Sequence, residues 1–318
     1  MQRPFAAASC ALLLALVATA HADPVAVLAA FKGKVTVAPA KGGEASKAAF
    51  GRSLENGDRV VTGPGGSVSI FFNDGNVIEL GEKSSMTVGG RVAARSAAGA
   101  EKLPGEVFAQ VARYSAGGSR QTGMVALSAL RSGGAVSGPE PLAPRNTDVL
   151  EARPALSWRA VEGAARYRVS MSGDAGEIWS RETSATTLAF PDDAAALAAD
   201  ADYLWEVQAF SASAPLAKAS TTFHLAPTAQ AQAVRGVLAR IHEGAGGDQK
   251  AAARFLSGSY LFGRGFYQDA ATQFEALSRL SPESPAPHEA LGNIYRAVGL
   301  MDLAAASFER ALSLSREP

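Results

Sequence analysis

Side chains that could act as catalytic acids, bases or metal ligands are few and scattered in this sequence. After residue 22 the chain has three histidines, His224, His242 and His288. A zinc site on one helix face needs two ligands about one turn apart, and no histidine here lies four residues from another. No Gly-x-Ser-x-Gly motif is present to expose a nucleophilic serine at a strand-to-helix turn. We therefore predict no metal site and no serine nucleophile.

The carboxylates that lie close together in the sequence flank an alanine-rich connection. They are Asp192, Asp193, Asp200 and Asp202. A pair of carboxylates can hydrolyse a glycosidic bond, but such a pair is assembled in space, and nothing in the sequence brings these four together. Capping of a short turn, or exposure to water, is the simpler interpretation. We predict no catalytic residue, no cofactor and no enzymatic activity.

Because no reactive site is predicted, a binding function is the remaining possibility. The segment best suited to binding is predicted to be helical and contains an internal sequence repeat. Four pairs of residues 34 positions apart carry the repeat: Gly258 and Gly292, Gly265 and Gly299, Ala270 and Ala304, Phe274 and Phe308. This segment resembles the tetratricopeptide family, whose helical hairpins recur every 34 residues. An additional helix is predicted over 229–242, where apolar residues recur at helical spacing and would cap one end of the array.

The tetratricopeptide resemblance implies a concave groove lined by the first helix of each repeat. By the family pattern, the groove residues are Phe255, Ser259, Phe262, Glu289, Asn293 and Arg296. A peptide held there would meet apolar side chains at one end and hydrogen-bonding groups at the other. The alternative is that two repeats are too few for a deep groove and that the preceding helix buries the two phenylalanines.

The last repeat has no polar helix after it to cover its outer face. We expect that face to dock onto another chain, including by self-association, or onto one of the protein's own β-domains.

A β-rich stretch near the N-terminus resembles a second family. Short apolar runs alternate with turn dipeptides, and Asp74-Gly75 joins two such runs into a predicted hairpin with one apolar and one wet face. The stretch resembles the periplasmic FecR-type domain. The residues that carry the resemblance are Gly33-Lys34-Val35, Gly57-Asp58-Arg59-Val60, Thr62-Gly63, Asp74-Gly75-Asn76, Ile78, Leu80 and Ser84-Ser85-Met86-Thr87-Val88. It implies an extracytoplasmic module that makes protein contacts.

A third region alternates large and polar residues in the manner of half-buried strands. Trp158 lies in an early strand, a Tyr167-x-Val169 strand follows Gly163, and Tyr203 comes six residues after Leu197. This region resembles a fibronectin type III sandwich, in which a tyrosine at that place bonds back to the backbone upstream.

The N-terminus has the order of a secretory signal peptide. Arg3 precedes an apolar run, and Ala20-His21-Ala22 follows it, so we predict cleavage after Ala22 and a periplasmic or secreted product with no transmembrane segment. Cys10, the single cysteine, would be removed, which excludes disulfides and thiol chemistry. Because 30 basic residues balance 30 acidic ones, no long-range field would attract nucleic acid.

The sequence thus predicts a multidomain chain of two all-β modules followed by an all-α array. Its predicted divisions are a signal peptide over 1–22, a FecR-like domain with an irregular tail over 23–132, a Gly/Pro linker over 133–145, a fibronectin-like sandwich over 146–227, and a helix plus two tetratricopeptide repeats over 228–318.

The predicted function is a non-enzymatic scaffold that binds proteins in the cell envelope, in a signalling or assembly complex. The alternative is a module that binds peptidoglycan or another polysaccharide, with Trp158, Trp179 and Trp205 as an aromatic platform. Burial of these rings in a β-sandwich core is the competing interpretation.

Overall fold

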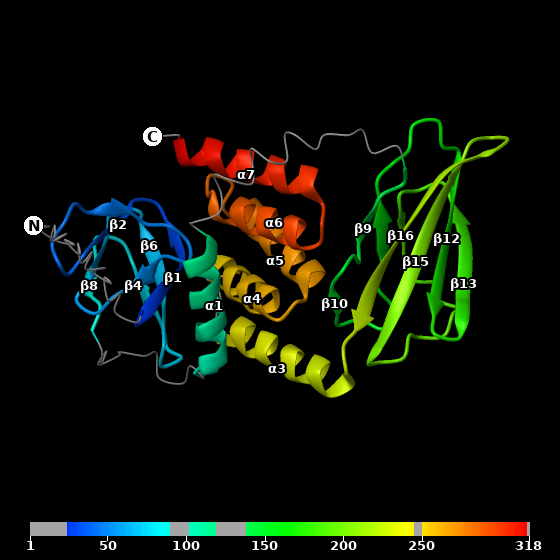
Figure 1. Ribbon diagram of the computed structural model, residues 1–318. Coiled ribbons are helices and arrows are strands. Elements are labelled where there is room, and N and C mark those ends of the chain that lie inside the picture. Colours follow the sequence, from blue (N-terminus) through cyan, green and yellow to red (C-terminus); the bar gives the residue numbers. More distant parts are fainter. Residues whose placement is uncertain (1–23, 90–101, 119–137, 245–249, 317–318) are drawn as a thin grey trace, which may run out of the picture.

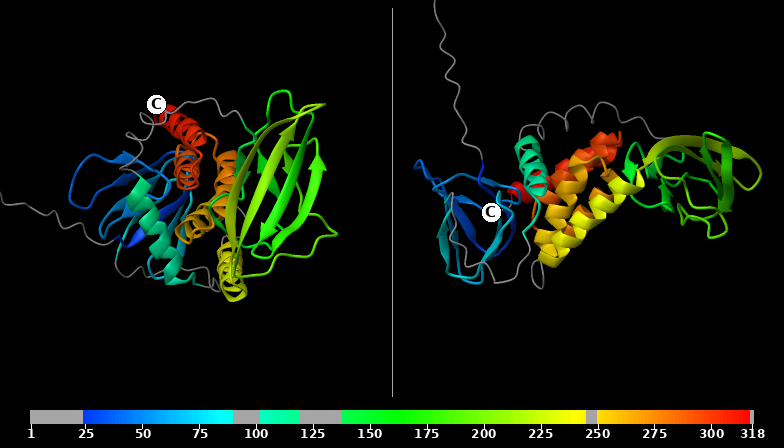
Figure 2. Two further views of the ribbon diagram at one scale, coloured as in Figure 1. Left: turned by 45° about the vertical axis from the view of Figure 1, so that its right-hand side comes forward. Right: turned by 90° about the horizontal axis from the view of Figure 1, so that it is seen from below.

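A computed structural model describes residues 24–89, 102–118, 138–244 and 250–316. The predicted signal peptide lies outside these residues. The chain forms three parts: a first β-domain, a second β-domain and a helical domain that comes last in the sequence. The helical domain nevertheless lies between the two β-domains, as both Figure 1 and Figure 2 show. Among the described residues, no helix is long and apolar enough to cross a membrane.

The first β-domain consists of two four-stranded sheets. Its strands are β1 (Ala26–Lys32), β2 (Val35–Ala38), β3 (Ser46–Lys47), β4 (Ser53–Leu54), β5 (Arg59–Thr62), β6 (Ser67–Phe72), β7 (Val77–Leu80) and β8 (Ser85–Thr87). The strand orders are β4-β1-β6-β7 and β3-β2-β5-β8. The predicted hairpin at Asp74-Gly75 is confirmed, since β6 pairs with β7 and places Ile70 opposite Ile78.

The predicted wet face of that hairpin is wrong for β6. Val68, Ile70 and Phe72 point into the core shared by the two sheets, while Phe71 points the other way and is also fully buried. Strand β1 is buried on both faces in the same manner. A strand buried on both faces must be covered by two layers. The second layer here is helical.

The second β-domain is a sandwich of five and three strands. Its strands are β9 (Pro141–Ala143), β10 (Asp148–Val149), β11 (Leu156–Trp158), β12 (Arg166–Gly173), β13 (Gly176–Thr183), β14 (Thr187–Leu188), β15 (Ala201–Phe210) and β16 (Pro215–Leu225). The sheet orders are β10-β16-β15-β12-β13 and β14-β11-β9. The hydroxyl of Tyr203 donates to the carbonyl of Ala198 at 2.8 Å, which confirms the predicted backbone bond of that tyrosine.

The predicted Gly/Pro linker extends too far. Strand β9 lies within it and pairs with β11, so the second β-domain begins before residue 146. Pro141 is accommodated because β9 is the edge of its three-stranded sheet, where a missing N–H costs no ladder bond.

The helices are α1 (Gly105–Gly118), α3 (Thr228–Gly244), α4 (Lys250–Gly263), α5 (Tyr267–Leu280), α6 (Ala286–Ala297) and α7 (Met301–Arg316). Two hairpins, α4–α5 and α6–α7, repeat the same internal packing. Gly258 faces the ring of Phe274, and Gly292 faces the ring of Phe308. The turns also match, because Gly265 and Gly299 have φ of +86° and +85°.

Helix α1 falls in the tail of the predicted FecR-like domain, which we expected to be irregular, so that expectation is wrong for residues 105–118. It precedes the second β-domain in the chain, yet it packs against α4 and, more lightly, α6. It is the layer that covers the outer face of β1 and β6 together with α4.

Candidate interaction site on the helical hairpins

The predicted groove positions on the first hairpin form one stripe of α4 that faces α1. Phe255, Ser259 and Phe262 are spaced by four and three residues and so share a helix face. Phe255 and Ser259 are buried, and Phe262 is half-buried. Gly263 continues the stripe, where it admits the side chain of Gln110 from α1. An outside peptide therefore cannot reach Phe255 or Ser259 while α1 is in place, and the cover comes chiefly from α1 and the first β-domain.

An aromatic cluster anchors α1 to this stripe. The ring of Tyr114 lies 5.7 Å from that of Phe274 in a stacked arrangement, and 5.6 Å and 6.2 Å from Phe262 and Phe255 in edge arrangements. Such pairs contribute about 0.5–1.5 kcal/mol each beyond the area they bury. Burial, with the charge of Glu289 as a second cause, raises the pKa of Tyr114 well above its usual range.

Helix α1 also binds the first β-domain. The ring of Phe108 lies 5.7 Å from that of Phe71 on β6, and Leu103 donates its N–H to the carbonyl of Gly75 at 3.0 Å. The β-domain touches α4 directly as well, through Phe50 and Phe255 at 5.8 Å. We call the joint cluster of these residues with the inner faces of α3 to α6 the central core.

The predicted groove positions on the second hairpin are less deeply covered. Glu289 and Arg296 are half-buried and Asn293 is buried. Arg296 donates to the side-chain oxygen of Asn293 at 3.1 Å. Burial raises the pKa of the Glu289 carboxyl, and no described residue forms an ion pair with it. The structure thus brings Phe255 and Phe262 together around Tyr114, and places Asn293 and Arg296 together on the next hairpin.

A short loop of the second β-domain docks on the turns of both hairpins. Thr147 donates its hydroxyl to the carbonyl of Gly265 at 2.9 Å and accepts the N–H of Tyr267 at 2.8 Å. Arg145 donates to the carbonyl of Val298 at 2.8 Å, 33 residues after Gly265. Two residues of one short loop therefore bind equivalent turns of the two hairpins.

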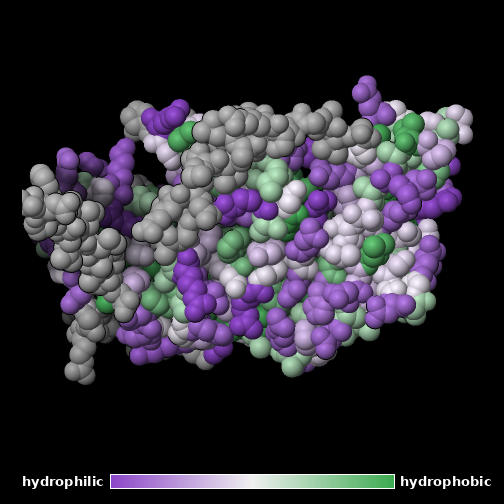
Figure 3. Space-filling model, in the orientation of Figure 1, coloured by the Kyte–Doolittle hydropathy of each residue, from purple (hydrophilic) through white to green (hydrophobic). Residues whose placement is uncertain are grey.

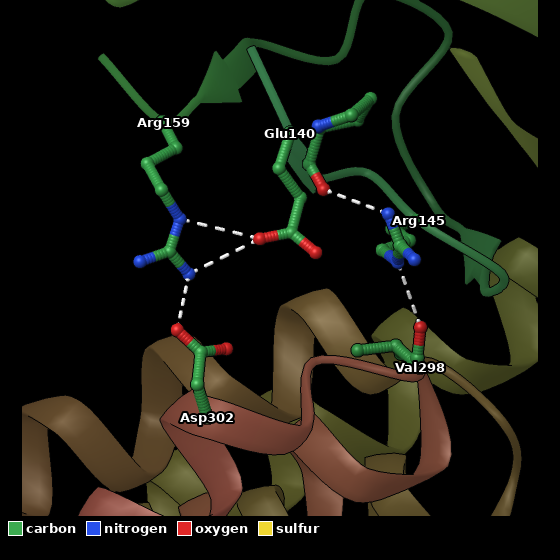
Figure 4. A network of polar contacts seen from close by, with 6 residues as sticks. Glu140, Arg145, Arg159, Val298 and Asp302 are labelled. Carbon is green, nitrogen blue, oxygen red and sulfur yellow. Dashed lines mark hydrogen bonds and ion pairs between the residues drawn. The ribbon is translucent and has the colours of Figure 1, made fainter. Parts of the chain in front are cut away.

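Ion pairs flank this docking loop, as Figure 4 shows. Arg159 contacts Glu140 at 3.1 Å within its own domain and Asp302 of α7 at 2.6 Å. The first turn of α7 thus contacts the protein's own second β-domain, but this ion pair does not cover the outer face of the last hairpin. Farther along α7, Leu312 remains 47% exposed. Self-association through that face stays a prediction.

A third contact between the second β-domain and the helical domain contains two carboxyl groups and one guanidinium group. Arg235 of α3 pairs with Glu151 at 3.1 Å and donates to the carbonyl of Leu150. Asp269 of α5 lies beside them. Burial, and secondarily the charge of Glu151, raises the pKa of Asp269 to about 6, although Arg235 and a bond from the Leu150 backbone oppose the shift.

The remaining titratable residues do not converge on a reactive centre in the described parts of the chain. His224 contacts Asp202 at 2.9 Å and Asp200 at 3.7 Å, and Asp193 pairs with Arg181. No group of three or more histidine, cysteine or acidic side chains among the described residues has the geometry to hold a metal ion.

The three tryptophans do not form a surface platform. Trp158, Trp179 and Trp205 are 2%, 5% and 0% exposed, and all three belong to the core of the second β-domain. Apolar residues on the face seen in Figure 3 are scattered among polar ones.

Sequence reasoning missed two parts of this site, helix α1 and the docking loop over 145–148. A signal for α1 was present, because Val107, Val111 and Tyr114 follow the four- and three-residue spacing of a helix face. The docking loop carried no comparable pattern, since its bonds go to carbonyl groups far away in the chain.

Comparisons with known proteins leave the family of this chain open. No family model matches it, and no curated protein matches it. A solved structure described as a cell surface anchoring domain is 28% identical over 21% of this chain and 88% of its own, with a TM-score of 0.20. A two-domain fibronectin type III segment from chicken tenascin is 10% identical over 63% of this chain and 94% of its own, with a TM-score of 0.18.

Proposed function

We propose that this protein is a non-enzymatic scaffold for protein–protein contacts outside the cytoplasm. In this proposal the hairpins α4–α5 and α6–α7 are tetratricopeptide repeats, the first β-domain is FecR-like and the second is fibronectin-like. The observation that carries the proposal is that the helical domain already binds polypeptide on two surfaces. It holds α1 against the α4 stripe, and it holds the loop at Arg145 to Asp148 on its turns.

The place of action rests on the N-terminal pattern of Arg3, an apolar run and Ala20-His21-Ala22. An envelope signalling or assembly complex is the setting that best suits a chain with this pattern and with binding surfaces in place of reactive groups. Polysaccharide binding lacks a supporting observation, because the three tryptophan rings that would form its platform are buried.

A photocrosslinking amino acid placed at Arg296 tests the proposal in intact cells. We expect discrete protein adducts from this position, and fewer of them when Asn293→Ala removes the other polar side chain of this part of the groove. The matched control position is Glu177 at the exposed edge strand β13. Equal adducts from both positions, or none from either, would contradict a binding role for α6. Sedimentation of the purified protein with peptidoglycan would reveal glycan binding instead.

A further inference from the structure

The docking loop is fixed firmly to the second β-domain. The carbonyl of Pro144, directly before the loop, accepts the ring N–H of the buried Trp205 at 2.8 Å. Within the loop, Asn146 donates its backbone N–H to the carbonyl of Thr222 on β16 at 2.8 Å. Strand β10, which follows, pairs with β16 as well. The loop therefore has a defined position on the core of the sandwich.

From this position the loop binds the turn of each hairpin. Thr147 donates its hydroxyl to the carbonyl of Gly265 in the first hairpin at 2.9 Å. Arg145 and the side-chain amide of Asn146 both donate to the carbonyl of Val298 in the second hairpin, at 2.8 Å and 3.2 Å; Figure 4 shows the bond from Arg145. A positive charge is favourable there, because the carbonyl lies at the C-terminal end of α6. One loop thus holds two turns at once.

The contacts between the hairpins themselves are mainly apolar. Helix α5 packs against α6, and the central core contains Leu277 of α5 and both Leu291 and Ile294 of α6. The exposed side chain of Glu275 also forms a hydrogen bond with Tyr295. Apolar packing is not directional, and packed helices can shift against each other by about 1–2 Å. Hydrogen bonds from a firmly held loop to two backbone carbonyls restrict such a shift directly.

The ion pair beside the docking loop is a weaker restraint. Arg159 and Asp302 are 33% and 51% exposed at their side chains. An ion pair exposed to this extent contributes little in water. The restraint on the second hairpin consequently comes chiefly from the bonds to Val298.

We propose that the second β-domain is a template that fixes the position of one helical hairpin relative to the other, with Arg145 and Thr147 as its positioning residues. This inference rests on the proposed scaffold function and adds a geometric role to it. Helix α1 and the first β-domain attach chiefly to the first hairpin, whereas Asn293 and Arg296 lie on the second. The template therefore determines where a partner bound at α6 stands relative to the first β-domain.

Spin labels on the two hairpins test this inference. Thr272→Cys on α5 and Ala306→Cys on α7 place the labels at exposed positions 34 residues apart in the sequence, and Cys10→Ser removes the other thiol. We expect Arg145→Met combined with Thr147→Val to broaden the distance distribution by about 1–2 Å. Thr147→Ser alone keeps the hydroxyl group and should leave the distribution as it is in the wild type.

Two controls separate loss of the template from unfolding. Arg153→Met removes a guanidinium group that donates to two carbonyl groups within the second β-domain, so it should not change the distance between the hairpins. Labels at Ala297→Cys and Ala306→Cys lie within the second hairpin and should keep one narrow distribution in every variant. If the double variant loses that narrow distribution, Arg145→Met alone provides the test, with a broadening in the same direction.

A distance between the hairpins that is distributed alike in the wild type and in the template variants would overturn the inference, because the hairpins would then hold their own spacing. Equal broadening with Arg153→Met would also overturn it. Crosslinking from Arg296 tests the scaffold function separately. Partner adducts together with an unchanged distance distribution would leave that function standing without the template.

Discussion

Single atoms decide how closely the helices of each hairpin approach one another. A Cβ added to Gly258 would lie 2.8 Å from the ring of Phe274, and one added to Gly292 would lie 2.6 Å from the ring of Phe308. Neither distance is compatible with van der Waals contact. The 34-residue spacing of these glycines in the sequence thus has a steric cause.

Replacing either glycine by alanine should therefore destabilise the helical domain. We expect Gly258→Ala and Gly292→Ala each to lower the free energy of unfolding by about 1–3 kcal/mol, as overpacked cores do. The matched control is Gly236→Ala in α3, where an added Cβ meets no atom within 4 Å. That change should stabilise the helix by up to about 1 kcal/mol. Thermal unfolding followed by circular dichroism at 222 nm distinguishes these outcomes.

The carboxyl group of Asp269 makes stability depend on pH. Its pKa is raised from 3.8 to about 6 in the folded protein, so the folded state binds the proton more tightly than the unfolded state. The resulting stabilisation is complete below pH 3.8 and is lost as pH rises through 6. We expect Asp269→Asn to remove roughly 1–3 kcal/mol of this pH dependence between pH 4 and pH 8.

The exposed Asp193 provides the opposite sign as a control. Its pKa is lowered by a hydrogen bond from Arg181 and by the charge of that residue, so its contribution to stability is lost as pH falls. Urea unfolding at several pH values compares Asp269→Asn with Asp193→Asn. A pH profile for Asp269→Asn that matches the wild type would show that this carboxyl group is not the cause.

At the scale of elements, the loop at Arg145 to Asp148 holds the second β-domain to the helices. Thr147 is 6% exposed and bonds to both sides of one inter-helix turn. A valine there has the same shape without the hydroxyl, and it would leave the N–H of Tyr267 without this partner.

Thr147→Val should weaken the docking of the second β-domain by about 1–3 kcal/mol, the cost of buried groups left unpaired. Spin labels at Glu177→Cys on β13 and Leu312→Cys on α7 report the distance between the two domains. We expect a broader distance distribution for Thr147→Val, and an unchanged one for Thr222→Val on the exposed face of β16. Unchanged widths in both variants would assign the docking to other contacts.

Local elements could be predicted from the sequence where local chemistry determines them. The hairpin at Asp74-Gly75, the backbone bond of Tyr203 and the matching turns at Gly265 and Gly299 all depend on residues close together in the chain. The occupant of the α4 stripe could not be predicted in this way. It depends on Tyr114 meeting Phe255, 141 positions later in the chain, and no pattern along the sequence encodes that pairing.

At the scale of the whole molecule, the described residues pack into three cores, one of which lies between the two sheets of the first β-domain. The central core joins the first β-domain, α1 and the helices, and the second β-domain adds only Leu150 and Ala226 to it. The sandwich has a separate core that contains every tryptophan of the chain. The core of the first β-domain shares strands β1 and β6 with the central core, whereas the sandwich core is linked to the central core mainly by polar contacts. We therefore expect the sandwich to unfold as one unit and the rest of the described chain as another.

Tryptophan fluorescence should therefore report on the sandwich alone, while circular dichroism at 222 nm reports on the helices. We expect Phe108→Ala to lower the stability measured by circular dichroism by about 3–5 kcal/mol, because it removes a buried ring from the central core. The fluorescence transition should stay in place. A fluorescence transition that moves together with the dichroism signal would mean that the molecule unfolds as one unit.

The order of the domains along the chain is not their order in space, and this affects how the protein folds as it is made. The first β-domain and α1 are synthesised first, and α4 begins about 130 residues after α1 ends. During that interval Phe71 and Phe108 lack the helices that complete their core. A chain that ends at residue 226 is expected to bind an apolar dye and to aggregate, unlike the full chain. The exposed apolar surface of newly made protein would accordingly have to be kept from contact with other chains until the last helices are synthesised.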